Sequence, residues 1–344
     1  MVKIKVLTTG LGSFPYKEPQ KALELILKYT PSVPFWPQLP KRDVRERMVA
    51  QFSEHFPCIK VGRDGIFFSG EGKERELELF YERIIANDLD YFAISADYAL
   101  GLQKFYQKLE DTNLKDAEFI KCQITGPFTF AASINDEKGV ALLHDSVFRQ
   151  AIIKGLTMKA LWQIKLFRKF NKKIIIFVDE PYLGCFGSAY TPINKEEVLR
   201  GLRELTQGIK SADTLIGVHC CGNTDWSLFT DVTSIDVISF DASSFLEKFL
   251  IYAEDIKKFI ERRGIVCWGI VPTQEFSGKE TPVLLSHKLR EGIAALTKKG
   301  IAPEALLGKI FISPACGLGA LDEAKAEKIL RLLADTAVNL EKNT

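Results

Sequence analysis

Long apolar runs are missing from this sequence of 344 residues. No window approaches the roughly 18 uncharged apolar residues that a membrane-spanning helix needs. The N-terminal residues, MVKIKVL, are typical of a short strand and lack the apolar core and small-residue cleavage site of a secretory signal. We therefore expect neither a membrane span nor export.

An excess of charge of either sign is missing as well. The 46 basic and 44 acidic side chains leave a formal net charge of +2. Lysines and arginines are scattered over predicted helices, such as residues 159–173 and 257–263, rather than gathered with aromatic side chains. A balanced chain of this kind produces no field that attracts nucleic acid or an anionic membrane, so we expect neither as a partner.

The seven cysteines lack the pattern of a disulfide framework, because they are odd in number and spread through a long chain. Reduced thiols in a cytoplasmic protein are the expected state. Cys122 and Cys267 lie inside apolar, strand-like runs, where packing is their expected role. The hydrophobic fraction of 46% and the charged fraction of 26% are those of a soluble globular protein.

A glycine-rich dinucleotide motif is also missing after the first predicted strand. What is present is a regular alternation of short, β-branched strands with helices, and continuous apolar strands indicate a parallel sheet that is buried on both faces. The strands are predicted at residues 3–7, 91–94, 118–124, 173–178, 214–218, 237–240, 265–270 and 309–312. Eight such units favour an α/β fold of the (β/α)8 TIM barrel type, as a single domain over residues 1–344, rather than an open doubly wound sheet.

An insertion at about residues 31–70 interrupts this alternation and is predicted to lie on the rim of the barrel. Residues 31–40 contain four prolines, so they cannot form a regular helix or a central strand and are expected to be an ordered covering loop. A helix is predicted over residues 43–54. The Asp-Gly pair at 64–65 predicts a hairpin over residues 59–68.

Metal-capable side chains follow two of the predicted strands, and active sites of such barrels lie at the carboxyl ends of the strands. His219 and Cys221 end one strand, and alternate residues of an extended chain face the same side. Cys220 between them faces away and is expected to pack. Cys316 follows the last strand in a loop bounded by glycine. A histidine with two thiolates is a ligand set that suits zinc, and zinc with an exchangeable position activates a substrate thiol as thiolate.

Two carboxylates, Asp179 and Glu180, open the loop after the strand at 173–178. Neighbouring residues of a strand face opposite ways, so we expect one carboxylate in the pocket and the other in a helix cap or an ion pair. Asp179 is the preferred pocket residue, where its carboxylate suits an ammonium group of a substrate.

Together the strand-end motifs resemble the cobalamin-independent methionine synthase family, specifically its C-terminal catalytic barrel, within the superfamily that also holds uroporphyrinogen decarboxylase-like enzymes. The resemblance covers nearly the whole chain and rests on Gly12-Ser13-Phe14-Pro15, Thr125-Gly126-Pro127, Asp179-Glu180-Pro181, His219-x-Cys221 and Cys316. It implies a zinc-dependent methyltransferase that makes methionine from homocysteine. His219, Cys221 and Cys316 would hold zinc, Asp179 would bind the substrate amine, and Ser13 and Thr125 would also contact substrate.

The sequence departs from the family at two positions. Asp241 stands near the place of a glutamate that is the family's fourth zinc ligand, so Asp241 is expected to take that role. Val44 stands where the family has a glutamate that holds the substrate amine. No stretch resembles the large N-terminal half that helps the full-length enzymes bind folate. The chain therefore resembles the short core form, for which a methylated corrinoid protein is the expected donor and folate the less favoured one.

Three other functions stay open. One is a decarboxylase-like enzyme that acts on a tetrapyrrole without a metal and uses rim arginines such as Arg42, Arg45 and Arg47. Another is a methyltransferase that moves methyl from methylcobalamin to a different thiol. The third is a non-catalytic partner protein that binds zinc or a corrinoid.

Overall fold

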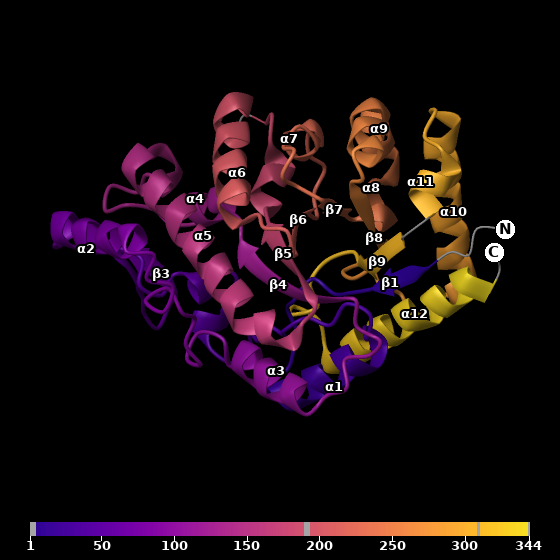
Figure 1. The fold of residues 1–344 in the computed structure, drawn as a ribbon, viewed down its shortest axis with the longest axis horizontal. Coiled ribbons are helices and arrows are strands. Elements are labelled where there is room, and N and C mark those ends of the chain that lie inside the picture. The colour runs from indigo at the N-terminus through magenta and orange to yellow at the C-terminus, as the bar shows by residue number, and fades with distance from the viewer. Residues whose placement is uncertain (1–4, 189–192, 308–309, 343–344) are drawn as a thin grey trace.

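The chain is described here by a computed structural model that covers residues 5–188, 193–307 and 310–342. Residues 3 and 4 of the first predicted strand and residue 309 of the last lie outside these ranges. Figure 1 shows a curled sheet in the middle of the molecule with helices around its outside.

The sheet contains seven parallel strands and curls into a half-barrel. They are β1 (Val6–Thr8), β4 (Phe119–Thr125), β5 (Lys173–Asp179), β6 (Thr214–Cys220), β7 (Val237–Phe240), β8 (Ile265–Val271) and β9 (Ile310–Pro314). Their order is β1-β9-β8-β7-β6-β5-β4, so β1 and β4 are the two edges. The α/β class and the parallel sheet are as predicted, and seven of the eight predicted strands form.

Helices alternate with the strands of the sheet along the chain, as predicted. They are α1 (Pro19–Tyr29), α2 (Lys73–Ile85), α3 (Leu100–Glu110), α4 (Pro127–Ala132), α5 (Ser146–Phe167), α6 (Lys195–Ile209), α7 (Ser227–Thr230), α8 (Ala242–Phe249), α9 (Ala253–Glu261), α10 (Pro282–Lys298), α11 (Pro303–Leu307) and α12 (Glu323–Lys342). Short 3-10 helices occur at Val44–Glu46, Ala50–Phe52, Leu142–His144, Arg168–Phe170, Pro181–Cys185 and Leu250–Tyr252. None of the helices in the described ranges has the length and apolarity that a membrane crossing needs.

Polar caps fix several of these helix starts. Asp145 accepts hydrogen bonds from the first backbone N–H groups of α5, Asn194 does the same for α6, and Thr281 for α10. The loops that follow the carboxyl ends of the strands lead into these helices, so the caps fix the points at which the loops end.

The predicted strand at residues 91–94 does not form. The backbone N–H groups of Tyr91, Phe92 and Ala93 bond within local turns, to Asp88, Leu89 and Asp90. Phe92 and Ile94 are nonetheless fully buried. The apolar pattern therefore predicts burial correctly, but it does not distinguish a buried turn from a buried strand.

The proline-rich segment at residues 32–38 lies instead between the two edge strands. On the β4 side, the carbonyl groups of Ser32, Pro34 and Trp36 accept hydrogen bonds from the backbone of Glu118 and Lys121 and from the Gln123 amide. On the β1 side, the Thr8 N–H donates to Ser32 Oγ and the Thr9 hydroxyl donates to the Val33 carbonyl. The segment thus contacts both edges of the half-barrel.

The prolines explain why this segment forms no regular ladder. Pro34 and Pro37 have a carbonyl but no N–H, and the pairing with β4 is limited to an isolated parallel bridge between Phe35 and Lys121. Its packing is tight, because a Cβ on Gly10 would lie 2.2 Å from the Phe35 ring. The prediction that residues 31–38 belong to a rim insertion is therefore wrong, since they occupy the gap between β1 and β4.

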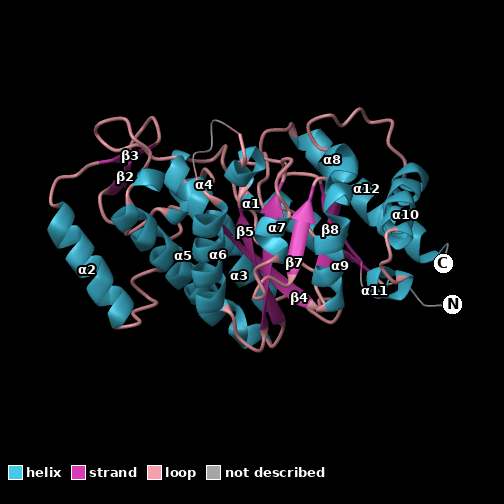
Figure 2. Cartoon of the chain, turned by 90° about the horizontal axis from the view of Figure 1, so that it is seen from above, coloured by secondary structure: helices cyan, strands magenta, loops and turns pink. Residues whose placement is uncertain are grey.

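The rest of the insertion differs in part from its prediction. The helix expected over residues 43–54 is replaced by two 3-10 turns, Val44–Glu46 and Ala50–Phe52. The hairpin is confirmed as β2 (Ile59–Val61) paired antiparallel with β3 (Ile66–Phe68). Figure 2 shows this hairpin to the side of the sheet, next to α2.

The interior of the half-barrel changes character along its axis. An apolar cluster fills it near the amino ends of the strands and includes Leu7, Val33, Phe119, Ile175, Phe177, Val237 and Phe311. Toward the carboxyl ends, buried polar side chains take over, among them Lys121, Gln123, His219 and Ser239. The fold therefore places its buried polar groups beneath the loops where an active site was expected.

Candidate metal and thiol site

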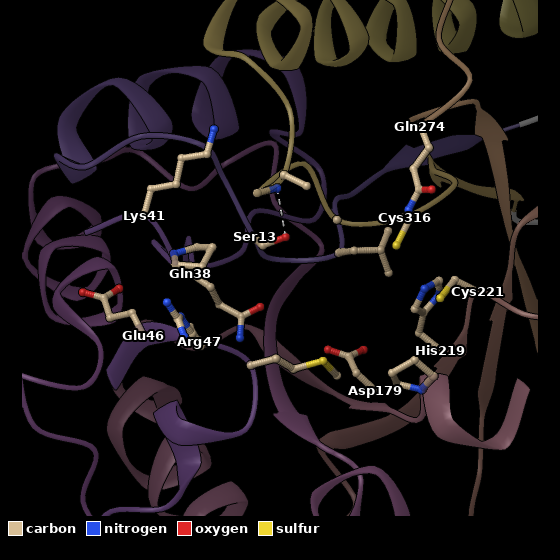
Figure 3. A pocket seen from close by; sticks show the side chains of 17 residues that line it. Ser13, Gln38, Lys41, Glu46, Arg47, Asp179, His219, Cys221, Gln274 and Cys316 are labelled. Atoms are coloured by element: carbon tan, nitrogen blue, oxygen red, sulfur yellow. Dashed lines mark hydrogen bonds between the residues drawn. The ribbon is translucent and has the colours of Figure 1, made fainter. Parts of the chain in front are cut away.

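His219, Cys221 and Cys316 meet at the carboxyl ends of β6 and β9, as their strand positions predicted (Figure 3). One ligand atom from each of the three lies within 4.8 Å of the others. Ligand atoms around a tetrahedral zinc lie roughly 3.5–3.8 Å apart, given bonds of about 2.0–2.3 Å. A small movement of the side chains would therefore bring the three atoms to coordination distance.

The imidazole of His219 is oriented with one nitrogen bonded and the other open. Its Nδ1 lies 3.0 Å from the hydroxyl of Ser239 on β7. Its Nε2 is buried and has no hydrogen-bond partner among the described residues. A buried polar nitrogen without a partner is costly, and a bound cation would satisfy it. Together with two thiols, this nitrogen makes a donor set that fits zinc.

The two thiols of the group influence each other directly. A hydrogen bond from Cys221, together with His219, lowers the pKa of Cys316, whereas the same hydrogen bond and burial raise the pKa of Cys221. The thiolate form of Cys316 is therefore favoured over that of an isolated cysteine. Thiolate is the form that binds metals.

A pocket of about 450 Å³ opens beside the group. Asp179 and Gln274 lie on the same side as the sulfur and imidazole ligands in Figure 3, and Gln38, Glu46 and Arg47 lie opposite them. The pocket thus has one wall with the imidazole and the two sulfurs, and charged and amide side chains on both sides. A small thiol with polar groups fits that arrangement.

Asp179 lines the pocket at the end of β5, directly across the ladder from His219. Its Oδ1 is buried and has no hydrogen-bond partner among the described residues. Burial raises the pKa of Asp179 to about 6, although the nearby charges of Lys121 and His219 act to lower it. An unpaired buried carboxylate of this kind is suited to receive a cationic group from a ligand.

Glu180 turns away from the pocket and caps α4, the second of the two roles expected for this pair. Its carboxylate accepts hydrogen bonds from the backbone N–H groups of Phe128 and Thr129 at 2.9 Å each and from the Thr129 hydroxyl at 2.7 Å. Burial raises the pKa of Glu180 to about 7. Successive side chains at a strand end point to opposite sides, so Asp179 faces the pocket and Glu180 has a structural role.

Ser13 lines the pocket, as the resemblance implied, and its Oγ accepts a hydrogen bond from the Gly319 N–H at 3.2 Å. Thr125 does not line the pocket. Its hydroxyl donates to the carbonyl of Met48 at 2.5 Å, and Met48 does line the pocket. Thr125 therefore acts on the site by holding the loop that carries Met48.

Asp241 is not brought into the ligand group. Its Oδ1 accepts hydrogen bonds from the Ser244 N–H at 2.9 Å and from the Ser243 hydroxyl at 2.7 Å, so Asp241 caps α8. A helix cap of this kind is a common role for an aspartate that follows a strand. Cys220, as expected, is fully buried in the hydrophobic core.

The arginines of the first loop have separate roles. Arg42 pairs with the buried carboxylate of Glu46, and Arg45 pairs with Asp43 and Asp97. Arg47 is exposed and lines the pocket. Of the three side chains considered for a tetrapyrrole, this leaves one that faces the pocket.

Several residues in or near the site were not identified from the sequence, and two of them are charged and buried. Glu46 lines the pocket two positions after Val44, and its carboxylate accepts hydrogen bonds from the Leu39 N–H and Arg42. Lys121 is fully buried, its charge interacts with that of Asp179, it donates to Gln123 Oε1 at 3.2 Å and it lies over the Phe177 ring. In the sequence, the buried charge of Lys121 was indicated only by the position of a lysine inside an apolar predicted strand.

No family model matches the chain, and no curated protein matches its sequence. Among solved structures, the chain is similar to a putative vitamin-B12 independent methionine synthase from Listeria monocytogenes, with a TM-score of 0.53 and 16% sequence identity over 94% of this chain and 86% of that one. It also aligns with a B12-independent methionine synthase from Shewanella sp. W3-18-1 (TM-score 0.48, 18% identity, 70% of this chain and 66% of that one). A fungal beta-1,4-galactanase aligns with a TM-score of 0.38 and 12% identity, over 72% of this chain and 90% of that one.

The likeness to the Listeria structure extends over nearly the whole chain and concerns the fold. An identity of 16% says nothing about which residues act, and the two lower TM-scores add no further support. The likeness is therefore one of fold, and the function of this chain has to be argued from its own site.

Proposed function

We propose that this protein is a zinc-dependent methyltransferase that transfers a methyl group to a small thiol, with homocysteine as the preferred acceptor. The observation that carries the proposal is the convergence of His219, Cys221 and Cys316 beside a pocket that also holds an unpaired buried carboxylate. The proposal takes residues 1–344 as one catalytic domain.

Within this proposal, His219 Nε2 and the sulfurs of Cys221 and Cys316 hold the metal and leave a position for the substrate. When bound there, zinc lowers the pKa of a coordinated thiol and so supplies a nucleophilic thiolate at neutral pH. The protein contributes a rigid frame for this chemistry, because two ligands come from one strand end and the third from another.

Asp179 orients the acceptor. Its buried Oδ1 faces no protein donor among the described residues, so an ammonium group of the substrate would gain a charge-assisted hydrogen bond there. Ser13 adds a hydroxyl on the pocket wall. An amino thiol is therefore preferred over a thiol that lacks the amine.

The methyl donor has to reach the thiolate through the open side of the pocket. A volume of about 450 Å³ leaves space beside a small amino thiol for the methyl-bearing part of a second molecule. A methylated corrinoid, free or carried by a protein, is the donor we favour, and a methyl folate is the alternative. The side chains of Gln38, Arg47 and Met48 lie on the wall that such a donor would meet.

The proposal is tested first by metal analysis of the purified protein. We expect about one zinc per chain, and we expect Cys221→Ser and Cys316→Ser each to lose it. Cys185→Ser changes an exposed cysteine outside the ligand group and serves as the control. A protein without zinc, or one that retains it after both serine substitutions, would contradict the proposal.

The second test is the reaction itself. Purified protein is mixed with methylcobalamin and a panel of thiols, and demethylation is followed by the change in the cobalamin spectrum. We expect the fastest reaction with homocysteine and a slower one with a thiol of similar length that lacks the amine. No thiol-dependent demethylation, with corrinoid and folate donors both supplied, would exclude the methyltransferase.

A further inference from the structure

We propose that Ser239 is a positioning residue that fixes the imidazole of His219 so that Nε2, and not Nδ1, binds the metal. The inference rests on the metal site of the proposed function and extends it to a residue behind the ligands. It starts from one contact, the 3.0 Å separation of His219 Nδ1 and Ser239 Oγ.

The backbone makes this contact a fixed property of the fold. His219 on β6 and Ser239 on β7 are partners in the parallel ladder, and Ser239 is in turn the partner of Cys267 on β8. Both side chains point into the half-barrel, and Ser239 is fully buried. Rigid strands on both sides therefore set the distance between hydroxyl and imidazole.

The chemistry of a neutral imidazole then decides which nitrogen is available. The ring carries one proton, and a metal takes the nitrogen without it. Ser239 Oγ lies where it can accept a hydrogen bond from a protonated Nδ1, and we infer that this is the tautomer that binds the metal. Nε2 is left as the lone-pair nitrogen, and it is the buried atom without a partner that faces the two sulfurs.

An imidazole that is already held in the binding orientation loses less conformational freedom when the metal binds. Loss of the hydroxyl would leave Nδ1 buried without an acceptor and would free the ring to turn. Partners of this kind behind metal-binding histidines typically account for a factor of about 10–100 in metal affinity. We expect an effect of that size from Ser239.

The test compares metal affinity in three variants. Ser239→Ala removes the hydroxyl, and Ser239→Thr keeps one at the same position. Ser286→Ala is the matched control, because Ser286 is a buried serine on α10 whose hydroxyl has no partner among the described residues. Zinc and cobalt affinities are measured by competition with a chromophoric chelator, and thermal unfolding checks that each variant is folded.

We expect Ser239→Ala to bind zinc and cobalt about 10–100-fold more weakly, with an altered cobalt absorption spectrum. Ser239→Thr should recover most of the affinity, and Ser286→Ala should match the wild type. A purely structural role for Ser239 would lower the thermal midpoint without changing the spectrum or the affinity of the folded protein, and that result would overturn the inference.

Nuclear magnetic resonance gives a direct reading of the ring. The chain has four histidines, so a sample labelled with ¹⁵N-histidine yields a spectrum that can be assigned by substitution. In the zinc-loaded wild type, we expect His219 Nδ1 to be protonated and Nε2 to be metal-bound. A metal on Nδ1 would refute the inference whatever the affinities are.

The outcomes separate this inference from the proposed function. Wild-type protein that binds no metal overturns both. Wild-type protein that binds zinc but transfers no methyl to any thiol overturns the proposed function, while the Ser239 comparison still stands on binding alone. Equal affinities of wild type and Ser239→Ala overturn only the inference.

Discussion

At the scale of single residues, two buried carboxylates next to each other in the chain have opposite surroundings. Asp179 faces the pocket with an unpaired oxygen, and Glu180 is enclosed by three donors at the start of α4. Burial raises the pKa of both. The pH dependence of substrate binding should therefore report on Asp179, whereas both carboxylates contribute to the pH dependence of stability.

Substrate binding is expected to weaken as the pH falls through the pKa of Asp179, because the protonated carboxyl no longer pairs with an ammonium group. That pKa is about 6 in the metal-free protein, and a bound cation would lower it. Lys121→Met removes a positive charge that lowers it, so the acidic limb should move to higher pH. The measurement is the KM for the amino thiol between pH 5 and pH 8.

Lys159→Met is the matched control for this shift. Lys159 is also a fully buried lysine whose burial lowers its pKa to about 8, but it lies on α5 and its charge does not act on Asp179. An unchanged acidic limb in Lys121→Met, or the same displacement in both variants, would show that Lys121 does not act through Asp179.

Glu180 should make the protein more stable at mildly acidic than at neutral pH. Its pKa is raised from 4.5 to about 7, so the folded state favours the protonated form. The stabilisation is complete below pH 4.5 and is lost as the pH rises to about 7, with a size on the order of 3 kcal/mol. Glu180→Gln does not titrate, so its urea-unfolding free energies should vary less between pH 5 and pH 7.5. Parallel curves for the two proteins would contradict this assignment.

At the scale of elements, the segment at residues 32–38 is important because it contacts both edge strands, β1 and β4. Phe35 fills the space above Gly10, where an added Cβ would lie 2.2 Å from the ring. Overpacking of a buried contact commonly costs about 1–3 kcal/mol. We expect Gly10→Ala to lower the urea midpoint by a corresponding amount with an unchanged m-value.

Gly62→Ala is the comparison for this substitution. Its added Cβ would come no closer than 3.2 Å to the exposed ring of Phe67, which has room to move. A change in stability within about 0.5 kcal/mol is expected there. If Gly10→Ala and Gly62→Ala change the free energy of unfolding by the same amount, the close packing of Phe35 against Gly10 does not stabilise the fold.

Most elements followed from local patterns, and the exceptions have a common cause. Strands β4 to β9 and helices α5, α6 and α10 carry apolar periods or caps that a reader of the sequence can recognise. Residues 91–94 and 32–38 were assigned the wrong places. Residues 91–94 are apolar but form local turns, and residues 32–38 contact β1 and β4 although two prolines interrupt their N–H groups. Hydrogen-bond partners far apart in the chain decide such cases, and no local pattern contains them.

At the scale of the whole molecule, the ligand group joins strands that are distant in sequence. His219 and Cys221 lie at the end of β6, whereas Cys316 follows β9. A metal that binds the folded protein and not the unfolded chain stabilises it by mass action, by about 2.7 kcal/mol when the free metal is 100-fold above its Kd. We expect a higher thermal midpoint with zinc than with a chelator, and no such difference in Cys316→Ser.

The proximity of the candidate site residues was predictable for a topological reason. Parallel strands deliver their carboxyl ends to the same edge, so His219, Cys221, Cys316, Asp179 and Ser13 could be placed together without knowing their distances. Asp241 and Thr125 also follow strands, yet they serve as a helix cap and a loop anchor. Sequence position indicates which edge a side chain reaches, and hydrogen-bond competition at that edge decides whether it enters the pocket.

The proline-rich segment at residues 32–38 is expected to affect whether the protein self-associates through the edges of its sheet. A parallel sheet of seven strands has two open edges, and residues 32–38 contact both of them. Because it contains prolines, the segment cannot itself serve as a template for another strand. A variant that dislodges it, such as Phe35→Ala, would uncover β1 and β4 together. We expect that variant to self-associate at temperatures where it is still largely folded, as light scattering would show, rather than to remain a less stable monomer.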